Sequence, residues 1–242
     1  MSAVAPNGVP IARSIPLHGL QRTIARRMLE GSQTTASVTA MAEVEAEALL
    51  RLLARERTRL PELTLTPLLV KAVAVCLRRH PRLNATLVED TIHELAEINI
   101  AVALTLPSDD LSVAILHQAD EQSLAALTTA LHVLRERATA GKLTVAEVRG
   151  ATFTVSNYGM LRHVLWATPI LTPGQVAVLG VARITPRLVP DAAGGYAVRP
   201  MLPFSLTYDH RVVNGVPAGR FLDDLADVLT TDTWLIEEGA SS

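Results

Sequence analysis

The distribution of apolar and polar residues predicts helices and strands that alternate irregularly along the chain. Apolar residues recur at helical spacing over residues 20–29, and we expect Gly31 to end this helix. Strict alternation over Ser37–Glu45 predicts a strand, and residues 204–208 alternate in the same way. Further helices are expected at residues 46–60, 66–77 and 121–139, and further strands at residues 98–106, 111–117 and 151–159. Thr66 is expected to cap the helix that follows it, and Pro81 to end that helix.

These elements fit one domain of the α/β class with a mixed sheet. A chain of 242 residues with 49% hydrophobic content is long enough to bury one sizeable core. Residues 1–14 lack periodicity and predict a flexible N-terminal arm. Residues 237–242 are charged or small and predict a flexible tail. The expected folded domain is therefore residues 15–236.

Charge and cysteine content exclude several classes of function. A formal net charge of -2 gives no electrostatic footprint for nucleic acid or an anionic membrane. The most apolar run, residues 65–77, contains Lys71 and is shorter than the roughly 20 residues of a membrane span. The single cysteine, Cys76, lies in this run and is expected to be a core residue. Without a signal peptide, a cytoplasmic location is expected. The histidines show no metal-ligand spacing, so no metal site is predicted.

The first candidate for chemistry is His210, which stands where the alternating pattern of residues 204–208 stops. A histidine has a pKa near neutrality, so at a strand end it can take a proton from a thiol or hydroxyl and return it. The alternative is an ordinary loop histidine, with Asn214, Gly215 and Pro217 forming the N-cap and first turn of the next helix. The second candidate is Ser156, whose hydroxyl either serves chemistry or bonds within its own turn.

Residues 207–215, Thr-Tyr-Asp-His-Arg-Val-Val-Asn-Gly, followed by Arg220-Phe221-Leu222, carry a family resemblance. They resemble the active-site signature Asp-His-Arg-x-x-Asp-Gly of the dihydrolipoyl acyltransferase catalytic domains of 2-oxo acid dehydrogenase complexes. The resemblance implies the mixed sheet with flanking helices of the chloramphenicol-acetyltransferase-like superfamily. Asn214 stands where aspartate is usual. Asparagine still accepts a hydrogen bond but brings no charge, and similar domains with asparagine here are known.

Other segments extend the resemblance over residues 15–236, and make this range the expected acyltransferase domain. Residues 151–159 are similar to the family's Thr-Phe-Thr-Ile-Ser/Thr-Asn-x-Gly, which implies that Ser156 donates a hydrogen bond to the oxyanion of the tetrahedral intermediate. Asn157, Gly159 and Asp209 belong to the same motifs and are expected to contribute to substrate binding. Residues 19–28 resemble the opening helix of the family, which implies a position for Arg22 near the active site. Residues 168–170, 175–181 and 199–201 are expected as further strands.

The resemblance implies an acyltransferase that uses coenzyme A or acetyl-CoA as a substrate and holds no bound cofactor. It also implies a homotrimer in which His210 and Ser156 face each other across a subunit interface. Three functions remain open. The first is a freestanding enzyme that acylates a small hydroxyl acceptor, such as a hydroxymethyl tetronate in polyketide antibiotic biosynthesis. The second is the core of a 2-oxo acid dehydrogenase complex, acting between dihydrolipoamide and CoA. The third is a non-catalytic assembly protein.

Two observations favour the first function over the second. Nothing in residues 1–14 resembles a lipoyl-bearing segment. Residues 103–115 also lack an acid, a glycine and a proline that the family carries where its substrate channel forms. Because both His210 and Ser156 are present, the non-catalytic function is expected least.

Overall fold

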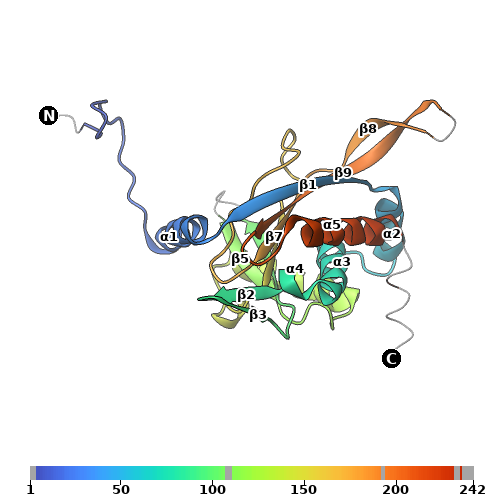
Figure 1. Ribbon diagram of the computed structural model, residues 1–242, viewed down its shortest axis with the longest axis horizontal. Coiled ribbons are helices and arrows are strands. Elements are labelled where there is room, and N and C mark those ends of the chain that lie inside the picture. The colour runs from blue at the N-terminus through green and yellow to red at the C-terminus, as the bar shows by residue number, and fades with distance from the viewer. Residues whose placement is uncertain (1–3, 107–110, 192–193, 232–234, 236–242) are drawn as a thin grey trace.

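A computed structural model describes residues 4–106, 111–191, 194–231 and 235. Its main body is a seven-stranded sheet with helices packed against one face (Figure 1). The α-helices are α1 (Gly19–Thr34), α2 (Glu47–Arg57), α3 (Leu65–Arg79), α4 (Leu124–Thr139) and α5 (Gly215–Thr230). The residues before α1 run away from this body, and the predicted tail of residues 237–242 lies outside the described residues (Figure 1).

The sheet is mixed, as predicted. Its order is β1-β9-β7-β6-β4-β5, and β8 pairs with the far end of β9. The strands are β1 (Ser37–Glu45), β4 (Ile100–Thr105), β5 (Leu111–Leu116), β6 (Phe153–Asn157), β7 (Ala177–Val181), β8 (Thr185–Pro190) and β9 (Tyr196–Asp209). The pairs β4–β6 and β6–β7 are parallel, and the other pairs are antiparallel. A separate hairpin joins β2 (Ala85–Val88) and β3 (Thr91–Glu94).

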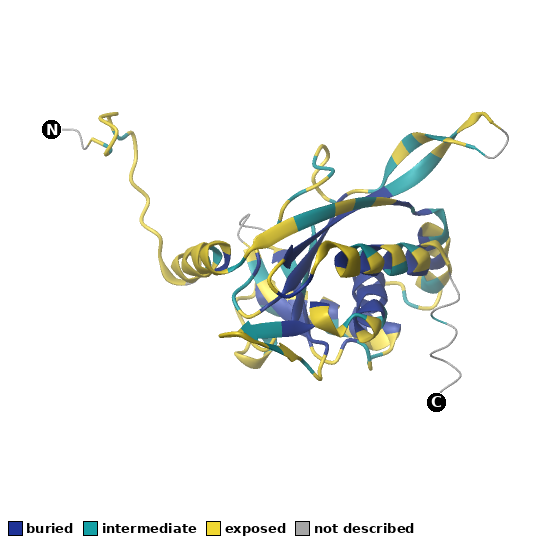
Figure 2. Cartoon of the chain, viewed as in Figure 1, coloured by how far each residue is buried: buried dark blue, intermediate teal, exposed yellow. Residues whose placement is uncertain are grey.

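The alternation along each strand decides which face meets the helices. On β9, Leu202, Phe204, Leu206 and Tyr208 are buried in the core between the sheet and the helices. Helix α3 is apolar nearly all round and is the most deeply buried helix, as its colour in Figure 2 shows. Its Lys71 is also buried, and the Nζ atom donates to the carbonyl oxygens of Asp120 and Gln122 at 2.8 and 2.6 Å. These bonds tie α3 to the turn before α4.

The structure corrects the expectation that Gly31 ends the first helix. Helix α1 continues through Gly31 to Thr34. Gly31 is buried, and a Cβ atom at this position would collide with the carbonyl oxygen of Leu171. The glycine is therefore needed for close packing against residues 170–171, not as a helix stop.

Two other expectations about elements were wrong. Residues 168–170 form no strand; instead the loop is tied to the sheet by Ser205 Oγ, which donates to the carbonyl of Ala167 at 2.7 Å. Residues 199–201 do lie in a strand, as expected, and this strand is the long β9 that also contains residues 204–208. The N-cap of α3 is Thr64 rather than Thr66, because the helix already begins at Leu65.

Candidate functional site

His210 directly follows β9, where two hydrogen bonds join the chain to Ala36, the residue before β1. The N–H of His210 donates to the carbonyl of Ala36 at 2.9 Å, and the N–H of Ala36 donates to Asp209 Oδ1 at 3.3 Å. The imidazole itself is exposed and lies beside the ring of Tyr208, with 5.8 Å between ring centroids. The sequence thus forms a rigid strand end that presents an accessible base at the surface of the chain.

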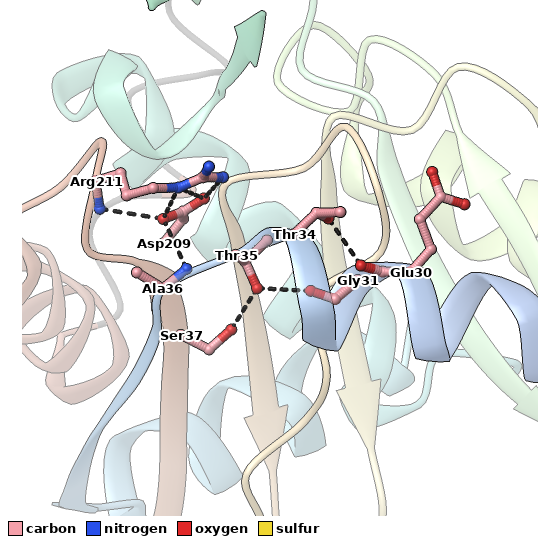
Figure 3. A network of polar contacts seen from close by, with 8 residues as sticks. All are labelled: Glu30, Gly31, Thr34, Thr35, Ala36, Ser37, Asp209 and Arg211. Carbon is pink, nitrogen blue, oxygen red and sulfur yellow. Dashed lines mark hydrogen bonds and ion pairs between the residues drawn. The ribbon is translucent and has the colours of Figure 1, made fainter. Parts of the chain in front are cut away.

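The flanking residues Asp209 and Arg211 form a two-pronged ion pair (Figure 3). Arg211 Nη2 lies 2.6 Å from Asp209 Oδ2, and Arg211 Nε lies 3.0 Å from Oδ1. Burial of Asp209 raises the pKa of its carboxyl, but the hydrogen bonds from the Arg211 side chain and from two backbone N–H groups outweigh burial and leave the pKa below its usual value. Both carboxylate oxygens are thereby occupied. Asp209, expected to help bind substrate, here fixes the turn that carries His210.

Asn214 stands at the end of the same turn. The N–H groups of Val212 and Val213 both donate to the carbonyl of Asp209, at 3.0 Å each, which closes the turn. Asn214 is the N-cap residue of α5, but its side chain makes no capping hydrogen bond and is exposed. The amide is therefore left available close in sequence to His210.

Ser156 lies on β6, on the face of the sheet that points away from the helices. Its neighbours Phe153 and Val155 are fully buried on the helix side, so alternation turns Ser156 to the opposite side. The register places Ser156 beside Gly180 of β7, and Gly180 beside Ser205 of β9. Ser156 is half-buried.

One chain does not bring His210 and Ser156 together. Ser156 is aligned with Ser205, and His210 lies five residues further along β9. At about 3.4 Å per residue, the offset along the strands is roughly 17 Å, and two strand spacings add to it. A hydrogen-bonded reacting group spans only about 3 Å. The histidine and the serine of a single chain therefore cannot act on the same thioester carbon.

Arg22 does not lie near either end of the sheet in its own chain. It is exposed in the first turns of α1, twelve residues before the helix ends at Thr34. At about 1.5 Å per residue, it lies roughly 18 Å along the helix from the junction beside His210. The helix projects away from the body of its own chain (Figure 1). The expected position of Arg22 near the active site is therefore not met within one chain.

A cavity of about 490 Å³ opens at the carboxyl ends of β4, β6 and β7, directly after Ser156. Asn157 and Gly159, both expected as binding residues, line it. Asn157 Nδ2 donates to Thr66 Oγ1 at 3.1 Å, and Asn157 Oδ1 accepts from the N–H of Gly159 at 2.9 Å. Residues 103–105, where the family motif is altered, also form part of the wall. The turn expected at residues 107–110 lies outside the described residues.

Sequence reasoning missed two arginines and a threonine in this wall, namely Arg135, Arg183 and Thr66. Arg135 belongs to a charged stretch of α4 that suggests only a solvated face, and Arg183 follows an apolar strand without any motif. Thr66 was expected only to cap its helix. These three residues share only their position in the tertiary structure. The start of α3, the last turns of α4 and the segment after β7 meet at the same edge of the sheet.

Other titratable groups lie outside these two regions. Cys76 is buried, and burial raises the pKa of its thiol to about 11, which fits a core residue. His80 caps the end of α3, and its Nε2 lies 2.8 Å from Asp224 Oδ2. Within the residues that the structure describes, no cluster of three or more His, Cys, Asp or Glu side chains is arranged to hold a metal ion. None of the described helices is long and apolar enough to cross a membrane.

Comparison with known proteins identifies sequence relatives along nearly the whole chain. The family model described as 2-oxoacid dehydrogenases acyltransferase (catalytic domain) matches residues 10–236. The dihydrolipoyllysine-residue acetyltransferase component of the pyruvate dehydrogenase complex of Mycobacterium bovis is 36% identical, over 91% of this chain and 40% of that protein. The dihydrolipoyllysine-residue succinyltransferase component of the 2-oxoglutarate dehydrogenase complex of Haemophilus influenzae is 32% identical, over 93% of this chain and 56% of that protein. The chain thus spans about half the length of such curated relatives.

Solved structures agree in fold. Dihydrolipoamide acetyltransferase from Azotobacter vinelandii, whose structural study addresses the role of a serine, a histidine and an asparagine in its catalytic mechanism, superposes with a TM-score of 0.88 at 28% identity, covering 94% of this chain and 95% of that chain. Chloramphenicol acetyltransferase superposes with a TM-score of 0.55 at 13% identity, covering 90% of this chain and 99% of that chain. The predicted chloramphenicol-acetyltransferase-like fold is confirmed.

Proposed function

Because the chain belongs to the family of 2-oxoacid dehydrogenases acyltransferase catalytic domains, we propose that it transfers acyl groups between coenzyme A and a dihydrolipoyl thiol. The observation that carries the proposal is the anchored turn of residues 209–214, which presents an exposed His210 beside a satisfied Asp209–Arg211 pair. The histidine and asparagine whose catalytic role was studied in the Azotobacter enzyme are four positions apart, as are His210 and Asn214. This spacing supports a catalytic turn that contains asparagine.

In the proposed mechanism, His210 removes the proton from the acceptor thiol, and the thiolate attacks the carbonyl carbon of the acyl-CoA thioester. The hydroxyl of Ser156 donates a hydrogen bond to the oxyanion of the tetrahedral intermediate. The intermediate collapses as the bond to the CoA sulfur breaks, and protonated His210 returns its proton to that sulfur. A positioned base contributes roughly 10²–10⁴ in rate, and one oxyanion donor roughly 10²–10³.

We place this chemistry between two copies of the chain. The offset of roughly 17 Å between His210 and Ser156 in one chain supports a site that takes the histidine from one copy and the serine from the next. Such a head-to-tail contact closes into a ring, and a homotrimer is the ring that the family resemblance implied. The exposure of His210 in the isolated chain is consistent with a position at an interface.

A small hydroxylated acceptor, such as a hydroxymethyl tetronate, is the second candidate. It is favoured by the cavity wall at residues 103–105, because the sequence departs there from the family motif and acceptor choice depends on pocket shape. The same base and oxyanion donor would serve a hydroxyl group. The two candidates differ only in the nucleophile.

The test is acetyl transfer from acetyl-CoA, measured by mass spectrometry of the acetylated acceptor for dihydrolipoamide and for a hydroxymethyl tetronate separately. A higher kcat/KM for dihydrolipoamide is expected, and a clear preference for the tetronate would replace the first candidate by the second. His210→Ala is the control. If this variant keeps more than about a tenth of the wild-type kcat, His210 is not the base.

A further inference from the structure

The hydroxyl of Ser156 has no hydrogen-bond partner among the residues that the structure describes. The turn after β6 is closed instead by Asn157, whose Oδ1 accepts from the N–H of Gly159 at 2.9 Å. A half-buried hydroxyl without a partner keeps its proton available for an oxyanion. The groups around Ser156 then decide whether water competes for that proton.

A tyrosine ring stands beside this hydroxyl, on the face of the sheet that points away from the helices. Gly180 of β7 is the strand partner of Ser156. A Cβ atom at Gly180 would lie 3.0 Å from Cε1 of Tyr158 and 2.9 Å from Ser205 Oγ. Ser205 points away from the helices, because its neighbours on β9 belong to the core. The Tyr158 ring therefore covers Gly180 on the face that carries the Ser156 side chain, about one strand spacing of 4.8 Å away.

Three hydrogen bonds connect Tyr158, Ser205 and Ala167 in a closed ring. Ser205 Oγ donates to the carbonyl of Ala167 at 2.7 Å, and the N–H of Ala167 donates to the Tyr158 hydroxyl at 3.1 Å. Because the proton of Ser205 is used in the first bond, the Tyr158 hydroxyl is the donor in its 3.4 Å contact with Ser205 Oγ. Ser205 is fully buried, so the bonds that it makes are shielded from water. The ring of bonds fixes both the tyrosine and the loop that follows β6.

The packing of the Tyr158 ring depends on glycine at position 180. Besides the two contacts given above, a Cβ atom there would meet Pro169 Cγ at 3.1 Å. Gly180 is buried beneath these groups, so water does not reach Ser156 from the β7 side. A hydrogen-bond donor that is shielded from water stabilises an oxyanion more strongly than a hydrated donor.

We propose that Tyr158 is a positioning residue for the oxyanion donor Ser156. Its ring covers Gly180 and keeps water away from the β7 side of Ser156, and its hydroxyl holds residues 167–169 against the sheet. Tyr158 acts through Ser156 and not on the reacting atoms. The inference rests on the proposed role of Ser156 in acyl transfer.

Steady-state kinetics with acetyl-CoA and dihydrolipoamide test this role in a double-mutant cycle. Tyr158→Ala removes the ring and should lower kcat about 10-fold, with little change in the KM for acetyl-CoA, because part of the roughly 10²–10³ supplied by one oxyanion donor is lost. Tyr158→Phe keeps the ring and should lower kcat less. In a Ser156→Ala background, Tyr158→Ala should lower kcat by less than about 2-fold further, because the donor on which it acts is absent.

Tyr196→Phe is the matched control for Tyr158→Phe. Tyr196 is 71% exposed on β9, and loss of its hydroxyl should leave kcat unchanged. Equal effects of Tyr158→Ala with and without Ser156, or an effect confined to KM, would overturn the proposal, since either result describes a residue that does not act through the oxyanion donor.

Amide hydrogen exchange tests the same contact without relying on catalysis. The N–H of Ala167 is bonded to the Tyr158 hydroxyl, so Tyr158→Phe should make this amide exchange about 10-fold faster in the assembled protein, whereas Tyr196→Phe should not. Mass spectrometry with fragmentation to single residues measures the rate. Unchanged exchange at Ala167 in Tyr158→Phe would overturn the proposal. Absence of acyl transfer by the wild type would refute the proposed function, while exchange at Ala167 still shows whether Tyr158 holds the loop.

Discussion

The substitution Asp209→Asn probes the support of His210 most sharply. In the wild type, the carboxylate of Asp209 is 4% exposed and takes hydrogen bonds from Arg211 and from two backbone N–H groups. Charge-assisted hydrogen bonds contribute about 1.5–3 kcal/mol each when buried. Because the Arg211 side chain is 48% exposed, solvent screening reduces this, and we expect a loss of about 2 kcal/mol in the free energy of unfolding at pH 7.

The pH dependence of this loss has a definite sign. The pKa of Asp209 is lowered in the folded chain, so its contribution is fully present above the unfolded pKa of about 3.9 and disappears as the pH falls through the folded pKa. The difference between wild type and Asp209→Asn should therefore be constant from pH 7 to about pH 5 and shrink below about pH 4.

Urea unfolding at pH 7 and at lower pH, followed by circular dichroism, measures both quantities. Glu94→Gln is the matched control, because the Arg82–Glu94 pair has a similar distance of 3.2 Å but side chains that are 56% and 48% exposed. It should cost less than about 1 kcal/mol. If Asp209→Asn costs no more than Glu94→Gln, or if its effect is the same below pH 4 as at pH 7, the ion pair does not stabilise the turn that carries His210.

Three further predictions concern single residues. Ser156→Ala should lower kcat by roughly 10²-fold with little change in the KM for acyl-CoA, since its hydrogen bond forms chiefly in the transition state; steady-state kinetics showing only a raised KM would assign Ser156 to substrate binding. Cys76, with a thiol pKa of about 11, should resist iodoacetamide in the folded protein and react once urea unfolds it; rapid labelling of the native protein would contradict its burial. Gly31→Ala should destabilise the protein by about 1–3 kcal/mol in urea unfolding, because the added Cβ meets the carbonyl of Leu171; an unchanged midpoint would show that the contact yields easily.

The parts of the fold that the sequence predicted are those governed by local pattern. Strand β1 has the predicted bounds, because its alternation matches a strand with one face on the core. Strand β8 was missed, since it contains Pro186 and Pro190 and, among the described strands, pairs with β9 alone. Gly31 was misread because a glycine that ends a helix and a glycine that permits close packing look alike in sequence.

In the candidate site too, features that are local in the chain were predicted and features that depend on tertiary structure were not. His210 and Ser156 were found because short motifs surround them, and the turn of Asp209, Arg211 and Asn214 is local in the chain. The offset between His210 and Ser156 depends on sheet register, which the sequence does not encode in any short segment. Arg135 and Arg183 are 48 positions apart and meet only because α4 and the end of β7 reach one edge of the sheet.

The central claim is that His210 of one copy acts with Ser156 of another, and complementation between inactive variants tests it most directly. His210→Ala and Ser156→Ala chains, differently tagged, are unfolded together in equal amounts and refolded, and mixed assemblies are isolated through both tags. In a head-to-tail trimer that contains both variants, one of the three sites receives an intact histidine from one chain and an intact serine from the next, whichever variant is present twice. The isolated mixed trimers should therefore recover about a third of the wild-type kcat per chain, far above either variant alone. Mixed assemblies no more active than the separate variants would contradict a site shared between two chains.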